Sequence, residues 1–464
     1  MWLLVIETLG SSAVVVAAAF MLVLVGCARL RRGPSQGTHR RGVVLIDGRK
    51  AQRRARRRQS RAAELTLAGV AIASADETKH FKLLGTTGTG KSTAIRELLG
   101  AALERGDRAV FADPDGGYCS RFYRRYRGDI VLNPFETDSM KWDLFAEIHN
   151  SYDVEQLAGG LIPAGDDASA NEWRGYARTF LVAVVRRALA CGWRDPANLW
   201  RLVTTASTEE LRPILAGTPA QPFLEPDNAR MFGSIRAVAV SAVAAFEYIQ
   251  AQRAAPFSVR AWVRAPSRAG ILFIPYKAGQ IAALRSMIAT WMRLAIFEAM
   301  SQPEEHDQRL WFVVDELDAI GRIDGLKDAL ARLRKFGGRC VLGFQSIAQV
   351  SCTYGASEAQ TIVENCGNTL ILRCSGSENG GTSQFASRLI GDREICRRQV
   401  SRGRDREGGW STRGARRSQS VTEHYTTEPA VMPSELEQLP DLCGYLKRAS
   451  SPQWLKIAFG GRHG

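Results

Sequence analysis

Eight consecutive residues, Gly85-Thr86-Thr87-Gly88-Thr89-Gly90-Lys91-Ser92, constrain this chain of 464 residues more than any other stretch. They match the phosphate-loop (Walker A) pattern G-x-x-x-x-G-K-[ST] at every fixed position. The apolar run Phe81 to Leu84 precedes them and a helical pattern from Lys91 to Leu103 follows, which is the strand–loop–helix context that the motif requires. The alternative is a Gly/Thr-rich turn ahead of a capped helix. Eight residues in register with the right flanks favour a site for a nucleoside triphosphate.

The residues of the loop have separate tasks in such a site. Glycines let backbone N–H groups curl round the phosphates, and the following helix points its positive dipole end at the anion. We expect Lys91 to reach the β- and γ-phosphates of ATP, and the Ser92 hydroxyl to bind Mg²⁺. The predicted nucleotide-binding residues are Gly85, Thr86, Thr87, Gly88, Thr89, Gly90, Lys91, Ser92 and Thr93.

Two acids at the end of a later apolar strand are the partner that a phosphate loop needs. The run Val313-Val314 leads directly into Asp315-Glu316. Asp315 is predicted to hold Mg²⁺ through water, and Glu316 to orient or deprotonate the attacking water. An Asp-Glu pair after a strand also occurs at helix N-termini, but downstream of a complete phosphate loop the catalytic interpretation is favoured.

A polar amide follows another predicted strand, Cys340 to Phe344, which ends in Gln345-Ser346. Gln345 beside the γ-phosphate would sense whether that phosphate is present and would couple hydrolysis to movement. The alternative is that Ser346 caps a helix and leaves Gln345 exposed. We favour the sensor because the phosphate loop and the acid pair fix the register.

The predicted helix Leu326 to Phe336 carries three cations near its C-terminus, Arg332, Arg334 and Lys335. Cations at this end of a helix are favourable for the helix dipole, which is a sufficient structural reason for them. In a ring of subunits, one such arginine would instead reach the γ-phosphate bound by a neighbour.

Short apolar strands alternate with helical patterns on both sides of the phosphate loop. This alternation predicts an α/β fold with a parallel central sheet. From about Ser151 to Ser258 the strand signals disappear and helical patterns dominate. The expected helices are Val154 to Leu161, Glu172 to Cys191, a capped helix from Ser207 with Glu210 three residues on, and a long helix around Ala229 to Arg253. The predicted organisation is a transmembrane anchor at 1–28, a basic linker at 29–62, a nucleotide-binding domain in two parts at 63–150 and 259–464, and an all-alpha insertion at 151–258.

Residues Ser11 to Ala28 contain no charge and predict a short transmembrane helix. A cleaved signal peptide would have a basic n-region, which Met1 to Glu7 lacks, and a buried core helix would not be followed by so many arginines. A lipoprotein-like tetrad, Leu24 to Cys27, would place an ATPase outside the cell. The flanking arginines place the body of the chain in the cytoplasm, as a single-pass protein.

Basic residues are concentrated after this segment. The net charge is +15, and between Arg29 and Arg61 thirteen Arg and Lys face a single acid, Asp47. This linker could lie on anionic lipid headgroups or act only as a topology signal, and both interpretations stay open; contact with nucleic acid is no better supported. Its apolar interruption, Val43 to Ile46, could be an edge strand. Residues 393–417, with nine Arg against three acids, are expected to form an exposed hairpin or a partly disordered loop.

Cysteine and histidine spacing gives no metal or disulfide signal. The nine cysteines are scattered without a C-x-x-C, and the six histidines form no H-E-x-x-H. This usage is typical of reduced thiols in a cytosolic compartment.

The motifs together resemble those of the conjugative coupling proteins of type IV secretion systems, the TrwB/TraD-type DNA-transfer ATPases. The resemblance runs from about Leu65 to Pro440 and rests on GTTGTGKS, DPDGG, Val131-Leu132-Asn133-Pro134, Glu172-Trp173, VVDEL and GFQS. It implies a RecA-like nucleotide domain interrupted by an all-alpha domain, in a hexamer anchored in the bacterial inner membrane. It also implies that ATP hydrolysis with Mg²⁺ moves single-stranded DNA and its relaxase toward the secretion channel.

The resemblance also assigns residues. Lys91 and Ser92 are the phosphate-loop pair, Asp315 and Glu316 the metal and water residues, Gln345 the sensor, and Arg334 the arginine most expected to act on a neighbour. Asp113 and Asp115 stand in the family's DPxG turn. Trp173 resembles a signature of the DNA domain, although a core tryptophan on an amphipathic helix explains it equally well.

Two departures from the family pattern are visible. The family usually has two transmembrane helices, and one is predicted here; and Gly117 stands where relatives often carry an acid, which weakens a metal role for the DPxG turn. Two other functions stay open: a double-stranded DNA translocase of the FtsK type, and a non-motor membrane receptor that docks protein substrates and uses nucleotide only for assembly.

Overall fold

The computed structural model describes residues 38–58, 65–165, 167–265, 270–303, 309–378, 380–404 and 417–460. Its chain separates into two compact units, one of 1–43 with 391–430 and one of 44–390 with 431–464. We describe each unit by itself.

The larger unit is built on a ten-stranded sheet in the order β2-β17-β16-β13-β5-β12-β11-β6-β10-β7. The seven strands from β13 to β7 are parallel to their neighbours, β16 is antiparallel to β13 and β17, and β17 and β2 pair in parallel. The predicted α/β fold with a mostly parallel sheet is therefore confirmed. The strands are β2 (Leu45–Asp47), β5 (Phe81–Leu84), β6 (Arg108–Pro114), β7 (Ile130–Val131), β10 (Ile271–Tyr276), β11 (Leu310–Val314), β12 (Gly338–Phe344), β13 (Asn368–Ile371), β16 (Cys443–Lys447) and β17 (Trp454–Ala458).

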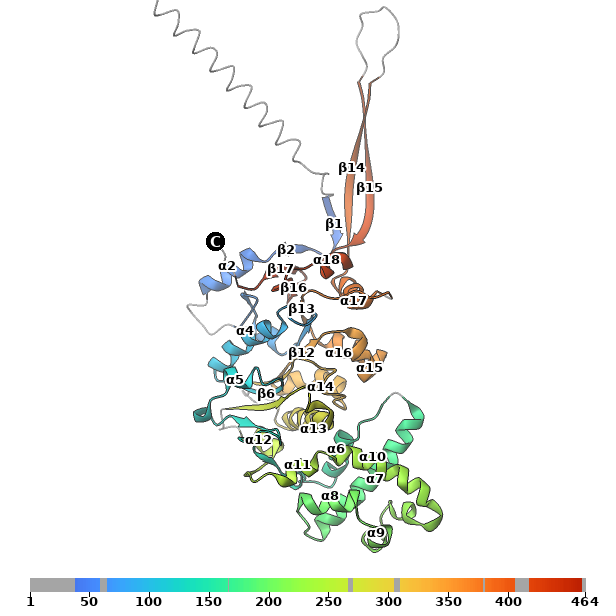
Figure 1. Cartoon of the computed structure of the whole chain (residues 1–464). Coiled ribbons are helices and arrows are strands. Elements are labelled where there is room, and N and C mark those ends of the chain that lie inside the picture. The colour runs from blue at the N-terminus through green and yellow to red at the C-terminus, as the bar shows by residue number, and fades with distance from the viewer. Residues whose placement is uncertain are drawn as a thin grey trace, which may run out of the picture. The chain divides into compact units, whose positions relative to one another are not determined.

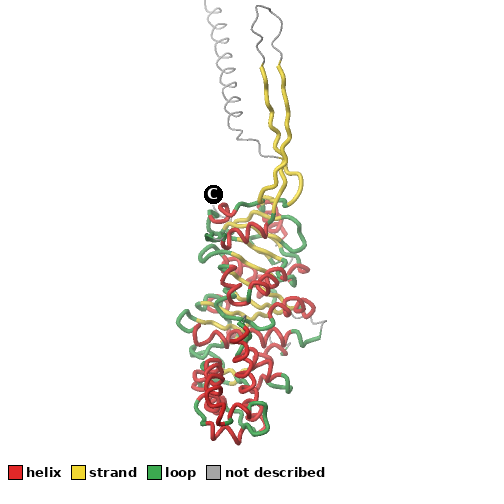
Figure 2. Tube along the Cα trace, turned by 90° about the vertical axis from the view of Figure 1, so that its right-hand side faces the viewer, coloured by secondary structure: helices red, strands yellow, loops and turns green. Residues whose placement is uncertain are grey.

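Helices flank this sheet (Figure 2). They are α2 (Arg49–Arg58), α3 (Ser74–Glu77), α4 (Lys91–Glu104), α5 (Cys119–Phe122), α12 (Val259–Arg264), α13 (Ile281–Ala299), α14 (Leu326–Leu333), α15 (Ile347–Tyr354), α16 (Ala356–Asn365), α17 (Gly381–Ile390) and α18 (Pro433–Glu437). Two small two-stranded sheets pair β3 (Thr66–Leu67) with β4 (Val70–Ala71) and β8 (Lys141–Trp142) with β9 (Pro256–Phe257).

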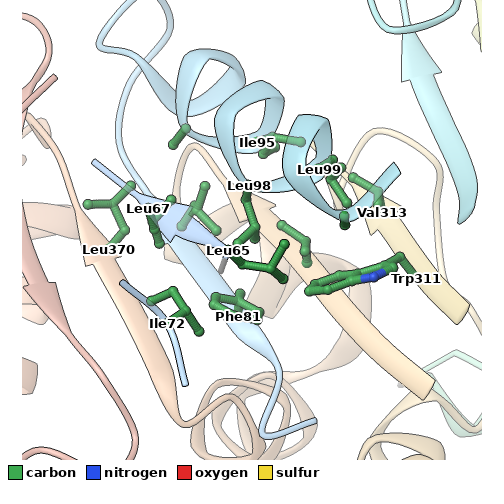
Figure 3. Close-up of a cluster of buried hydrophobic side chains, with 14 of the residues drawn as sticks. Leu65, Leu67, Ile72, Phe81, Ile95, Leu98, Leu99, Trp311, Val313 and Leu370 are labelled. Atoms are coloured by element: carbon green, nitrogen blue, oxygen red, sulfur yellow. The ribbon is translucent and has the colours of Figure 1, made fainter. Parts of the chain in front are cut away.

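The core lies where α4 packs over the central strands. Ile95, Leu98 and Leu99 recur at helical spacing and are fully buried, so one face of α4 is apolar. Figure 3 shows these side chains against Phe81 of β5 and Trp311 of β11. The strands read as continuous apolar runs because both faces of a parallel sheet are covered.

Residues 153–255, apart from 166, contain helices and no strand. They form α6 (Asp153–Leu161), α7 (Ala168–Ala190), α8 (Pro196–Thr204), α9 (Thr208–Ile214), α10 (Ala229–Val243) and α11 (Phe246–Ala251), with short 3-10 turns between them. Ser207 caps α9 by accepting a hydrogen bond from the N–H of Glu210, as predicted. Helices α7 to α11 gather at one end of the larger unit (Figure 1).

The helix expected around Ala229 to Arg253 is interrupted after Val243. The second piece, α11, begins at Phe246, whose ring packs edge-on against Trp142 with the ring centroids 5.8 Å apart. This contact is made with a residue a hundred positions earlier, so the local periodicity could not reveal it.

The smaller unit is a three-stranded antiparallel sheet of β1 (Thr38–Gly42), β14 (Asp392–Arg404) and β15 (Arg417–Pro429). Strands β14 and β15 pair along their full 13 residues. The predicted exposed hairpin at 393–417 is therefore present, and its strands extend further than expected, from Asp392 to Pro429.

Much of the N-terminal region lies outside the described residues, including the expected membrane helix at 11–28. Among the described residues, no helix combines the length and the apolar character needed to cross a bilayer. Within the expected linker at 29–62, residues 38–58 form β1, β2 and α2. Strand β2 lies at an edge of the large sheet, as predicted for the apolar residues 43–46.

Candidate nucleotide site

The predicted phosphate loop connects β5 to α4. Gly88 has φ 78° and Gly90 has φ 117°, both in the left-handed region that favours glycine. A Cβ on Gly90 would also lie 2.8 Å from Cδ2 of Leu442. The Thr89 hydroxyl donates to the carbonyl of Thr86 over 2.8 Å, which closes the loop on itself. The sequence at these positions therefore specifies one loop conformation.

Lys91 is buried at the start of α4. Its ammonium donates to the carbonyl oxygens of Gly85, over 2.6 Å, and Thr86, over 3.2 Å. Burial lowers the pKa of Lys91, and the nearby charges of Asp315 and Glu316 act in the opposite direction.

The parallel sheet brings the acid pair to the loop. Strands β5 and β11 both pair with β12, so their carboxyl ends meet at the same edge of the sheet. The Ser92 hydroxyl donates to Oδ2 of Asp315 over 2.8 Å. The other carboxylate oxygen of Asp315, Oδ1, is buried and has no hydrogen-bond partner among the described residues.

Gln345 lies between the phosphate loop and the second acid. Its side-chain oxygen accepts a hydrogen bond from the Thr87 hydroxyl over 3.2 Å, and its side-chain N–H donates to Oε1 of Glu316. Burial, followed by the charge of Asp315, raises the pKa of Glu316, while the hydrogen bond from Gln345 lowers it. One amide thus contacts both the loop and the candidate water-activating carboxylate.

The DPxG turn is connected to the acid pair through hydrogen bonds that the sequence did not reveal. The Asp113 carboxylate accepts hydrogen bonds from the backbone N–H groups of Tyr118 and Cys119. Burial raises the pKa of Asp113 to about 6. Tyr118 then donates its hydroxyl to Oδ2 of Asp315 over 2.7 Å. The turn is therefore connected to the acid pair by a tyrosine; Asp115 itself has φ 56° within the turn.

These groups surround a cavity of about 290 Å³. Its lining is Thr87, Gly88, Gly90, Lys91, Ser92, Thr93, Arg96, Asp315, Glu316, Gln345 and Leu442. Arg96, Tyr118 and Leu442 are the site residues that sequence reasoning missed. Arg96 stands one helical turn after Ser92, a spacing that could have identified it. Leu442 could not have been identified from the sequence, because it lies 350 positions after Ser92. Its backbone N–H donates to the carbonyl of Thr89.

Arg334 lies away from this cavity. It is in the short 3-10 turn Arg334–Phe336 that precedes β12, at the opposite edge of the parallel sheet from the carboxyl ends of the strands. Its charge acts on His80, which comes directly before β5 and whose pKa is lowered to about 4, mainly by burial. Within one chain, Arg334 is therefore not part of the cavity.

Trp173 is half-buried in α7 and lines a cleft of about 1250 Å³ between the helical region and residues of α13, α15 and the segment after β11. Asp318 and Arg322, which follow the acid pair along the chain, line the same cleft. The core-tryptophan interpretation does not fit this position.

Comparison with known proteins gives one consistent result. A family model described as the type IV secretion-system coupling protein DNA-binding domain matches residues 64–459. Coupling protein TraD of Escherichia coli (strain K12) is 30% identical over 412 residues, which cover 87% of this chain and 56% of TraD. The chain thus spans about half the length of that relative.

Solved structures of similar sequence have the same fold. The unbound bacterial conjugative coupling protein TrwBΔN70 superposes with a TM-score of 0.81 at 31% identity, covering 93% of this chain and 96% of that one. Plasmid coupling protein TrwB with the ATP analogue ADPNP gives a TM-score of 0.79 at 31% identity, covering 93% and 98%. TrwB with ADP and Mg²⁺ gives 0.79 at 30% identity, with the same coverage of 93% and 98%.

Proposed function

Because this chain belongs to the type IV secretion-system coupling protein family, we propose that it is a membrane-anchored ATPase that pumps single-stranded DNA during conjugation. In this proposal it joins the relaxase–DNA complex to the secretion channel, works as a homo-hexamer, and is anchored in the inner membrane by residues 11–28 with its body in the cytoplasm. The description of the family as DNA-binding and the nucleotide complexes of TrwB support the proposal.

The residues of the cavity fit ATP and Mg²⁺. The left-handed glycines of the loop leave room for phosphate, and Lys91 lies at its base. Ser92 and Asp315 are the pair that would hold Mg²⁺. Oδ1 of Asp315, which finds no hydrogen-bond partner in the described part of the chain, is the kind of buried oxygen that a hydrated cation satisfies. When bound, Mg²⁺ neutralises charge on the β- and γ-phosphate oxygens.

Hydrolysis is supported most directly by the pair of contacts at Gln345. Glu316 is the carboxylate available to accept a proton from water, and Gln345 donates to it while accepting from Thr87 of the loop. A change at the γ-phosphate side of the loop would therefore alter a hydrogen bond that favours the charged form of Glu316. Lys91 would bind the phosphates and leave the carbonyls of Gly85 and Thr86.

A route from hydrolysis to movement is also available. The acid pair directly follows β11, and Asp318, two residues after Glu316, lines the cleft shared with Trp173 of α7. A shift of the segment after Glu316 would change the packing at this cleft. We propose that this segment transmits the state of the nucleotide to the helical region.

The test is ATP hydrolysis by the full chain in detergent, with single-stranded DNA, double-stranded DNA or no DNA. We expect stimulation by single-stranded DNA, weakened steeply by salt because backbone phosphates are contacted. Glu316→Gln should lower kcat by about 10²–10⁴-fold, the usual contribution of a general base. Hydrolysis indifferent to DNA would favour the receptor, and stimulation only by double-stranded DNA would favour an FtsK-type translocase.

A further inference from the structure

Residues 397–401 and 420–424 of the β14–β15 hairpin form a two-stranded ribbon whose side chains are exposed on both faces. In the described part of the chain, strand β1 pairs with β14 as far as Cys396. Beyond it, residues 397–401 and 420–424 are all exposed. A two-stranded hairpin alone is marginally stable in water, so this length of ladder indicates a surface that covers it. Figure 1 shows β14 and β15 as two long arrows that run side by side.

One face of the ribbon carries exposed apolar side chains on both sides of the Arg398–Glu423 ion pair. The register places Val400 opposite Val421, and side chains two positions apart share a face, so Tyr425 lies on the same face as both valines. These side chains are 46%, 53% and 53% exposed, respectively. Two arginines accompany them: Arg398 shares the face by the same alternation, and the guanidinium of Arg40 lies over the Tyr425 ring at 4.6 Å.

The charge of this small sheet is positive. Its three strands contain eight arginines and four acids. Glu394 pairs with Arg40 and Arg41, Glu423 with Arg398, and Glu428 with Arg393 and Arg397. Valine and tyrosine among arginines are the side chains that suit the boundary between an anionic headgroup layer and its acyl chains.

The direction of β1 indicates where that boundary lies. Strand β1 is antiparallel to β14 and its first residue, Thr38, pairs with Cys396, so the chain enters β1 from the side of the hairpin tip. Nine residues, 29–37, separate Thr38 from the apolar segment 11–28 and span at most about 30 Å. From Cys396 the ladder extends eight residues to Arg404, roughly 27 Å. This length of chain is sufficient for the outer ladder to contact a membrane that holds the anchor proposed at 11–28.

We propose that the face formed by Val400, Val421 and Tyr425 docks on an anionic phospholipid surface beside the membrane segment. This inference rests on the membrane anchor at residues 11–28 proposed above. Arg398 and Arg40 remain largely exposed while paired with Glu423 and Glu394, so the lipid headgroups contact the open sides of these two guanidiniums. The two valines and the tyrosine ring enter the headgroup layer.

The experiment is amide hydrogen exchange on the full chain in nanodiscs of phosphatidylcholine, with or without phosphatidylglycerol, and in detergent. We expect exchange in peptides from 392–401 and 420–429 to slow at least tenfold only when phosphatidylglycerol is present. Val400→Glu should remove this effect, whereas Gln399→Glu, which adds the same charge one position away on the opposite face, should retain most of it. Tyr425→Ala replaces Val400→Glu if exchange in detergent shows that the latter unfolds the hairpin.

The outcomes separate the two proposals. A chain that enters both nanodiscs and shows no dependence on phosphatidylglycerol overturns the docking alone. Slow exchange already present in detergent, and lost in Val400→Glu, identifies a second copy of the chain as the occupant and also overturns it. A chain that enters neither nanodisc overturns the anchor and the docking with it.

Discussion

At the scale of single residues, Asp315 is the side chain on which the site converges. One of its oxygens accepts from both Ser92 and Tyr118, and the other has no partner among the described residues. Two donors on one oxygen fix the orientation of the carboxylate. Tyr118 is therefore a positioning residue for Asp315.

We predict that Tyr118→Phe reduces the gain in nucleotide affinity that Mg²⁺ provides by roughly 10- to 150-fold, since a hydrogen bond to a charged group contributes roughly 1.5–3 kcal/mol. Affinity for fluorescent ADP should be measured with Mg²⁺ and with EDTA; the EDTA value should not change. Tyr123→Phe is the control, because its ring contacts Phe273 and not the acid. If Mg²⁺ raised the nucleotide affinity equally in Tyr118→Phe and in the unmodified chain, Tyr118 would have a packing role only.

The pH dependence of hydrolysis follows from Glu316. Its pKa is raised mainly by burial, and the active form is the carboxylate, so activity is present above this pKa and is lost as pH falls through it. Gln345→Ala removes the hydrogen bond that lowers the pKa. We predict that the acid limb of kcat/KM then moves to higher pH. The control is Gln349→Ala, which changes an exposed glutamine of α15 and should leave the acid limb of kcat/KM unchanged. If the acid limb stayed unchanged in Gln345→Ala as well, a group other than Glu316 would be responsible for it.

At the scale of elements, the position of the acid pair depends on a close approach of two strands. A Cβ on Gly343 of β12 would lie 1.9 Å from the backbone oxygen of Asp315, and Leu317 donates its N–H to the Gly343 carbonyl. Only glycine permits this approach. The pairing of β11 with β12 therefore fixes the position of Asp315 and Glu316 as well as the packing of the core.

Gly343→Ala should lower stability by about 1–3 kcal/mol, the usual cost of overpacking, and should also weaken nucleotide binding because Asp315 must move. Gly100→Ala is the matched control: it lies inside α4 with open space at its Cβ, and should raise stability by about 0.5–1 kcal/mol. Thermal unfolding and nucleotide titration of both variants test this. A Gly343→Ala protein that binds normally would show that β11 tolerates the shift.

At the scale of the whole molecule, the two edges of the parallel sheet carry different groups. The carboxyl ends of β5, β11 and β12 meet at the cavity, whereas Arg334 lies before the start of β12. An arginine at that edge can act on a nucleotide only from another subunit.

We therefore predict that Arg334→Ala subunits mixed with unmodified ones inhibit hydrolysis more than in proportion to their number. Arg332→Ala, an exposed arginine one residue before the end of α14, is the control and should dilute activity in proportion. Rates across a series of mixing ratios distinguish the two. Proportional loss with Arg334→Ala would mean that this arginine contacts no neighbouring site.

Local pattern was sufficient for a large part of the fold. The strands around the phosphate loop and the helices α4, α6, α7 and α9 were predicted because their signals (apolar runs, caps and helical periods) lie within the elements themselves. The break between α10 and α11 was missed because Phe246 is placed by distant Trp142. The full length of the β14–β15 hairpin was missed because its strands are polar on the outside and are joined by cross-strand ion pairs.

The sequence by itself determined the phosphate loop, the acid pair and the amide, since each is a run of adjacent residues with one chemical use. Only the tertiary structure decided that Tyr118 and Ser92 share an oxygen of Asp315, that Leu442 closes the loop, and that Arg334 stands at the far edge. These relations depend on strand order and on contacts between segments hundreds of residues apart. Such contacts are made by packing, and no short run of residues encodes them.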